Sequence, residues 1–100
     1  MSRRVIFEPE ARVEFENAVA WYNEREPGLG DRFSGEVNAA IGRILDDPER
    51  YPLRGKTVRR ASVETFVKYS ILFSIMPTYI GVVAIFHGAR NPARLRRRLK

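Results

Sequence analysis

The sequence predicts an α+β domain in which a helical hairpin packs on one face of a small, mostly antiparallel sheet. Two observations carry this prediction. Apolar residues recur at helical spacing between residues 9 and 46, whereas residues 56–87 form strand-length runs, of which residues 66–75 alternate between apolar and polar. One short apolar run precedes the helices. The expected order is therefore β-α-α-β-β-β, in a single domain that spans residues 1–100.

The first half predicts a strand followed by two helices. The run "RRVIFEP" ends in Pro9, which suits the first turn of a helix because the N–H that proline lacks needs no partner there. The stretch "REPGLGD" then separates two amphipathic stripes, and so short a break favours an antiparallel hairpin. The stripes comprise Ala11, Phe15, Ala18, Val19 and Tyr22, and then Leu29, Phe33, Val37, Ile41, Ile44 and Leu45.

The second half changes to the period of strands. "KTVRRASV" predicts a short strand, "FVKYSILFSI" alternates, and "YIGVVAIFH" is apolar on both faces, which is typical of a central strand. Residues 91–100 form a basic tail with two leucines four residues apart, which predicts a short helix or a mobile end. In the alternating strand we expect one core face and one partly open face: Val67, Tyr69, Ile71, Phe73 and Ile75 against Phe66, Lys68, Ser70, Leu72 and Ser74.

The chain is basic, with 18 Lys and Arg against 12 Asp and Glu and a net charge of +6. Such a balance indicates an anionic partner: nucleic acid, an acidic protein segment or a membrane surface. The sequence has no cysteine and one histidine, so we expect no disulfide, no metal centre and no cofactor. No segment resembles a signal peptide or a membrane span, which predicts a cytoplasmic protein without a membrane partner.

Five basic residues are expected to form one patch that binds a target or a phosphate. If the last three strands form a meander, Arg59 or Arg60 neighbours Lys68, and Arg90 and Arg94 follow the last strand. Such a patch would bind phosphates in a salt-dependent manner, or pair with carboxylates of a partner. The alternative is that these charges only solvate a small protein.

His87 is the only side chain whose ordinary pKa lies near neutrality, which makes it the one ready general acid or base. Together with Lys68 and Arg90 it has the chemistry to cleave RNA through the 2′-hydroxyl. The proline after Asn91 favours extended backbone and would aim Arg90. The alternative for His87 is a structural role, in which its ring donates to a backbone carbonyl at the end of the strand.

In this order these segments resemble the RelE/ParE superfamily of toxins from type II toxin-antitoxin systems, over nearly the whole chain. "FEPEARVEFENAVAWYNER" and "GLGDRFSGEVNAAIGRILDDPERYP" resemble the two helices of the family. "VRRASVETFVKYSILFSI" is similar to its arginine-bearing strand and the aromatic strand that follows. The most specific segment is "VVAIFHGARNP", which resembles the last strand with its His-Gly-Ala-Arg ending.

The resemblance implies a small cytosolic toxin that forms a hetero-oligomer with a cognate antitoxin, whose disordered arm wraps the toxin. RelE-like members cut mRNA on the ribosome, whereas ParE-like members inhibit DNA gyrase. The ending "HGARN" resembles the ParE-like side, and no tyrosine follows Tyr79, so we expect growth inhibition through DNA gyrase. Two alternatives stay open. One is a RelE-like endoribonuclease with His87, Arg90 and Lys68 as catalytic residues; the other is a non-enzymatic nucleic-acid-binding module.

Overall fold

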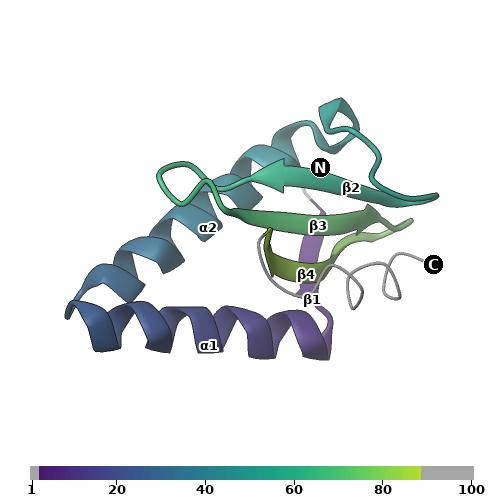
Figure 1. The fold of residues 1–100 in the computed structure, drawn as a ribbon. Helices are drawn as coiled ribbons and strands as arrows, with labels where there is room; N and C mark the ends of the chain where they lie inside the picture. Colours follow the sequence, from purple (N-terminus) through teal and green to yellow (C-terminus); the bar gives the residue numbers. More distant parts are fainter. Residues whose placement is uncertain (1–2, 89–100) are drawn as a thin grey trace.

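The computed structural model describes residues 3–88, which form two helices and one sheet (Figure 1). This confirms the predicted α+β class and the order β-α-α-β-β-β. The basic tail, with Arg90 and Arg94, lies outside the described residues. Within them, no helix has the length and apolar character needed to span a membrane. The elements are β1 (Arg4–Phe7), α1 (Pro9–Arg25), α2 (Leu29–Asp46), the 3-10 helix η1 (Pro48–Arg50), β2 (Val58–Ser62), β3 (Tyr69–Ile75) and β4 (Tyr79–His87).

The four strands form one sheet in the order β1-β4-β3-β2. The pairs β2–β3 and β3–β4 are antiparallel, whereas β1 pairs with β4 in parallel. A parallel pair needs a long crossover, and both helices lie in the connection that follows β1. β4 is thus an interior strand, as its apolar sequence predicts.

The two helices pack on one face of the sheet (Figure 1). Pro9 stands in the first turn of α1, as predicted. Gly28, at the start of α2, has a φ of 92°, a left-handed conformation that favours glycine. The side-chain oxygen of Asn23 accepts hydrogen bonds from the N–H groups of Gly28 and Gly30, at 3.1 and 2.8 Å. These bonds satisfy free N–H groups at the start of α2 and join it to α1.

The main core lies between the helices and the sheet, with Phe33 of α2 at its centre. The Phe33 ring is fully buried and contacts the rings of Tyr22, Phe66 and Tyr69, with centroids 5.3, 5.1 and 4.9 Å away. Tilted and edge-on pairs of this kind add to the stabilisation from burial alone. Ten of the eleven residues of the two predicted helical stripes belong to this core or pack against it; the exception is Leu29, the first residue of α2.

A β-bulge in β4 decides which side chains reach each face of the sheet. Leu72 pairs with Ala84 and Phe73 pairs with Val82, which leaves Val83 as the extra residue of β4. Without a bulge, Val82 and Ile85 would point to opposite faces, but both lie in the core beneath the helices. A second buried cluster lies on the opposite face: Val58, Leu72, Val83 and Ala84, with Phe86 against it.

The predicted alternation of the third strand is wrong before Tyr69 and in part beyond it. Residues 66–68 belong to the turn that precedes β3. Phe66 packs into the core rather than on the open face, whereas Val67 is 72% exposed. Because a turn does not preserve the period of two, alternation counted through these residues assigns them to the wrong faces. The face expected to be partly open is also buried at Ser70 and Leu72.

Candidate functional site

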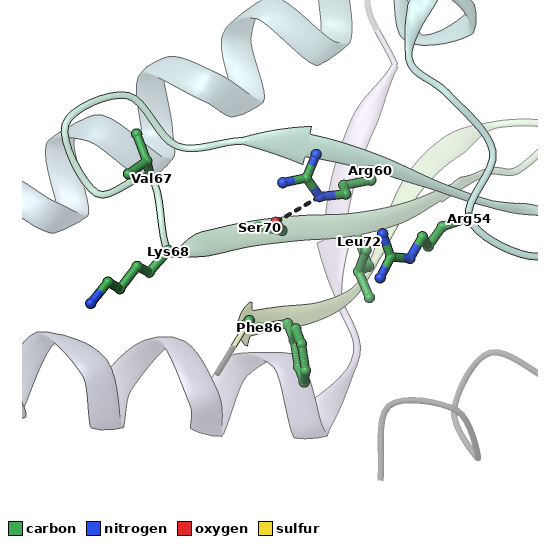
Figure 2. A pocket seen from close by; sticks show the side chains of 8 residues that line it. Arg54, Arg60, Val67, Lys68, Ser70, Leu72 and Phe86 are labelled. Carbon is green, nitrogen blue, oxygen red and sulfur yellow. Dashed lines mark hydrogen bonds between the residues drawn. The ribbon is translucent and has the colours of Figure 1, made fainter. Parts of the chain in front are cut away.

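A pocket of about 360 Å³ lies on the sheet face that points away from the helices (Figure 2). Its floor comes from alternate residues of β3 and from Phe86 of β4, and its basic side chains come from β2 and two loops. This size is at the small end of ligand pockets. The pocket is lined by Arg54, Arg60, Val67, Lys68, Ser70, Leu72, Phe86 and Gly88.

Arg60 is positioned by the sheet. It pairs with Leu72 in the ladder between β2 and β3, and its Nε donates a hydrogen bond of 2.9 Å to Oγ of Ser70. Ser70 is 7% exposed, so this bond also satisfies a buried hydroxyl. One edge of the guanidinium is thereby fixed, and its remaining N–H groups suit a bidentate interaction with an oxyanion.

Arg54 reaches the pocket through the loop between η1 and β2. The N–H groups of Arg54 and Gly55 donate to the carbonyl oxygen of Val58, at 2.6 and 3.3 Å, which folds the loop into a tight turn. The N–H of Arg60 donates to the carbonyl of Pro52, which ties the loop to β2. Arg54 is not among the residues predicted for the site, because its position depends on this folding back.

Lys68 lies in the turn before β3 and not on the strand, where the sequence predicts it. Its carbonyl accepts a hydrogen bond of 2.8 Å from the N–H of Gly88, which joins the start of β3 to the end of β4. Its side chain is exposed and extends at the margin of the pocket (Figure 2). The structure thus brings Lys68 and Arg60 to one pocket, as the predicted patch requires.

Arg59 points elsewhere. Its Nη1 donates hydrogen bonds to the backbone carbonyls of Glu49 and Tyr51, at 3.1 and 2.7 Å. Because neighbouring residues of a strand face opposite ways, Arg59 and Arg60 do not share a surface. Arg59 holds η1 against β2 and does not line the pocket.

His87 lies on the helix side of the sheet, so the structure settles its face. It pairs with Tyr69 in the ladder between β3 and β4, and the two rings meet edge-on with centroids 5.0 Å apart. Tyr69 belongs to the main core beneath the helices. The sheet therefore separates the imidazole from Arg60, and His87 does not line the pocket.

The charged side chains in the described lining of the pocket are all basic. Its three basic side chains face no acidic residue among the described residues that line it. The structure shows no ion pair for Arg54 or Lys68 within residues 3–88; the ion pair there joins Arg43 to Glu64 at 3.6 Å, on the helix side. Like charges held around one hollow repel one another and attract an anion. In the same part of the chain, no group of three His, Cys, Asp or Glu residues is arranged to hold a metal.

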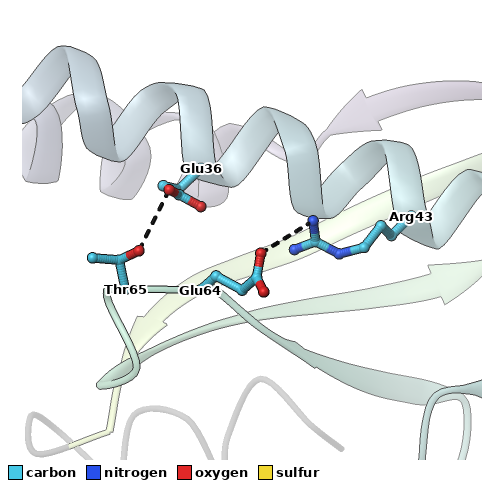
Figure 3. Close-up of polar contacts among 4 residues, drawn as sticks. All are labelled: Glu36, Arg43, Glu64 and Thr65. Carbon is cyan, nitrogen blue, oxygen red and sulfur yellow. Dashed lines mark hydrogen bonds and ion pairs between the residues drawn. The ribbon is translucent and has the colours of Figure 1, made fainter.

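The turn that carries Lys68 is fastened to α2 by polar contacts (Figure 3). Oγ1 of Thr65 donates to Oε2 of Glu36 at 3.4 Å, next to the ion pair of Glu64. Thr65 has a φ of 70°, a left-handed conformation that is costly for a β-branched residue. The protein thus keeps a strained residue three positions before Lys68.

Replacing Thr65 with asparagine is expected to raise the free energy of unfolding by about 1 kcal/mol, because asparagine tolerates the left-handed conformation. Urea unfolding of the two proteins measures this difference, which is a change in stability if both proteins have the same m-value. Thr65→Val keeps the β-branch and removes the hydroxyl, so it isolates the contribution of the bond to Glu36. A lower stability for Thr65→Asn would show that this bond outweighs the strain.

Comparisons with known proteins agree with the fold and the resemblance. The model of a family described as "ParE toxin of type II toxin-antitoxin system, parDE" matches residues 5–92. The chain is similar to "Toxin RelE1" of Caulobacter vibrioides, with 26% identity over 89 residues that cover 88% of this chain and 96% of the relative. It also matches a solved structure titled "Chromosomal ParDE TA system from P. aeruginosa".

That structural match has a TM-score of 0.74 at 12% identity and covers 86% of this chain and 96% of the other. At so low an identity it shows a shared fold. The family match is broader evidence, because it spans all the described strands and helices from Val5 onward. The chain is therefore a member of the family of ParE toxins of type II toxin-antitoxin systems.

Proposed function

We propose that this toxin acts in the cytoplasm and arrests growth by binding DNA gyrase through its cationic surface, without cutting RNA. The chain's place in the ParE toxin family supports this target. The pocket supplies a surface with Arg54, Arg60 and Lys68 around an apolar floor. A protein target with a complementary acidic surface would be attracted and oriented by such a charge distribution.

The position of His87 carries the argument against RNA cleavage. Cleavage through the 2′-hydroxyl needs a proton acceptor beside the cations that hold the phosphate. His87 pairs with Tyr69 on the helix side, whereas Arg60 and Lys68 line a pocket on the other side. The described residues of the pocket include no histidine, carboxylate or tyrosine. Apart from Lys68, the described lining holds no side chain of the types that commonly act as general acid or base.

The expected partner is a cognate antitoxin. The family belongs to type II toxin-antitoxin systems, and the similar structure is titled as a ParDE system. An acidic segment that folds on binding can cover much of a domain of this size and neutralise its basic surface. We propose that the toxin and this antitoxin form a hetero-oligomer.

The second candidate is a RelE-like endonuclease that cuts mRNA on the ribosome. One observation favours it: the curated relative, whose sequence matches over most of both chains, is named Toxin RelE1. In this alternative His87, Arg90 and Lys68 are the catalytic residues, and the ribosome would have to complete the arrangement of groups. Arg90 lies outside the described residues.

His87→Ala is expected to leave growth arrest within about twofold of the native toxin, because the imidazole does not face the cations of the pocket. The experiment is inducible expression, followed by growth curves, transcript mapping and gels of plasmid supercoiling. If the proposed function is correct, cells that express either the native toxin or His87→Ala show altered supercoiling and intact transcripts. His87→Gln, which keeps a polar side chain of similar length, controls for the lost contact with Tyr69. Codon-phased cuts in mRNA that disappear in His87→Ala would establish the endonuclease instead.

A further inference from the structure

We propose that the cationic pocket binds a compact phosphorylated ligand that carries a flat apolar ring, of the nucleoside 5′-phosphate class. This inference goes beyond the proposed function, because it can hold whatever macromolecule the toxin inhibits. It rests on the charge, the floor and the surroundings of the pocket.

The charge of the pocket fits a phosphate monoester better than a carboxylate or a phosphodiester. Arg54, Arg60 and Lys68 place three positive charges around about 360 Å³, without an acidic residue in the described lining. A phosphate monoester carries a charge of about −1.5 to −2 near pH 7 and offers three acceptor oxygens. A carboxylate or an internal phosphodiester carries only one negative charge. A phosphate monoester therefore neutralises more of the positive charge of this pocket than either of these groups.

The arrangement of the donors also suits phosphate oxygens. Nε of Arg60 donates its hydrogen bond to Ser70. This bond holds the guanidinium in place and leaves the outer N–H groups for a ligand. Arg54 comes from a different loop, so two planar cations approach the pocket from separate elements (Figure 2). Arginine is a frequent phosphate ligand because its planar guanidinium can donate two parallel hydrogen bonds, and here the orientation of Arg60 is fixed in advance.

The floor of the pocket provides a place for the ring. Leu72 is buried, whereas the ring of Phe86 is only partly buried and lies at the end of β4. Ser70 pairs with Phe86 across the strands, so the hydroxyl that holds Arg60 stands beside this aromatic ring. Bases stack on exposed aromatic side chains, and the stacking tolerates any base. A nucleotide thus has a partner for each of its two chemical parts.

The surroundings favour a compact ligand over a long strand. Single strands are bound along grooves in which cations follow the backbone over several nucleotides. Here Arg59, the basic neighbour of Arg60 on β2, is taken up by the carbonyls of Glu49 and Tyr51. Among the described residues of β2, Arg60 is therefore the one basic side chain that lines the pocket.

The test is isothermal titration of the full 100-residue chain with AMP, adenosine and inorganic phosphate as separate probes, at low and at high salt. We expect AMP to bind at least about tenfold more tightly than either fragment, because only AMP contacts both the cations and the ring. Arg54→Gln or Lys68→Gln should each weaken AMP binding about tenfold. Phe86→Leu should weaken AMP binding about fivefold or more and leave the binding of phosphate unchanged.

Matched controls make the outcome decisive. Arg32→Gln and Lys56→Gln remove the same charges at exposed positions that do not line the pocket, and should leave binding unchanged. Circular dichroism melts confirm that each variant is folded. Failure of AMP to bind the folded protein would overturn the proposal. So would equal losses in the control variants. An oligonucleotide without a terminal phosphate and an acidic peptide are titrated in the same way, and tighter binding of either than of AMP would also overturn the proposal.

Discussion

Replacing Gly30 with alanine is expected to lower the free energy of unfolding by about 3 kcal/mol or more, because the new methyl group has no space. A Cβ at this position would overlap the backbone carbonyl oxygen of Val19 and come within 2.7 Å of the Asn23 side chain. The clash with a backbone atom cannot be relieved by a rotamer change, so α1 and α2 must separate. Separation would also strain the hydrogen bonds that Asn23 accepts from Gly28 and Gly30.

The same helix offers matched controls for Gly30. A Cβ added at Gly35 or Gly42 meets no atom within 4 Å, and both positions are exposed. Alanine there should raise stability by about 0.5–1 kcal/mol, because glycine is the poorer helix former. Urea unfolding of the three variants measures these differences of opposite sign. Equal stabilities for Gly30→Ala and Gly35→Ala would show that the helices are not in close contact at Gly30.

The helices could be predicted because their signals are local. Pro9 begins α1, the glycines near residue 28 separate the hairpin, and Phe33 and Val37 follow at helical spacing into the core. Each signal depends only on residues within a turn or two of the chain. The parallel pairing of β1 with β4 is a different kind of fact, since it joins residues at opposite ends of the sequence.

The faces of β4 could not be predicted, because one bulge changes them. Val83 is an apolar residue in an apolar run, and nothing in its local sequence marks it as the extra residue. The bulge becomes visible only through the pairing of Leu72 with Ala84 and of Phe73 with Val82. The face of His87, and with it the argument about RNA cleavage, follows from this register.

The basic patch was predictable in part. Arg60 lies on β2, and Lys68 immediately precedes β3. These two strands pair, as a meander predicts, so both residues reach the pocket. The choice between Arg59 and Arg60 depends on the pleat of β2, and the sequence leaves it open. Arg54 enters through a loop that folds back through backbone bonds to Val58 and between Arg60 and Pro52, and no residue pattern in the sequence marks this turn.

The largest functional effect is expected from reversing two charges of the pocket together. Arg54→Glu combined with Lys68→Glu should lower affinity for an anionic target on the order of 100-fold, and so abolish growth arrest. Each reversal removes an attraction and adds a repulsion. Both side chains are exposed, and the structure shows no hydrogen bond or ion pair from either of them to the residues it describes. The fold should therefore tolerate the double variant, which a thermal melt checks.

The matched control separates the position of the charge from its amount. Arg32→Glu combined with Lys56→Glu changes the same residue types at exposed positions outside the pocket. Each reversal changes the net charge by −2, so both double variants go from +6 to +2. If growth arrest is lost only in the pocket variant, the toxic contact depends on Arg54 and Lys68 in particular. Equal loss in both variants would show instead that the overall positive charge carries the effect, and the pocket would no longer explain toxicity.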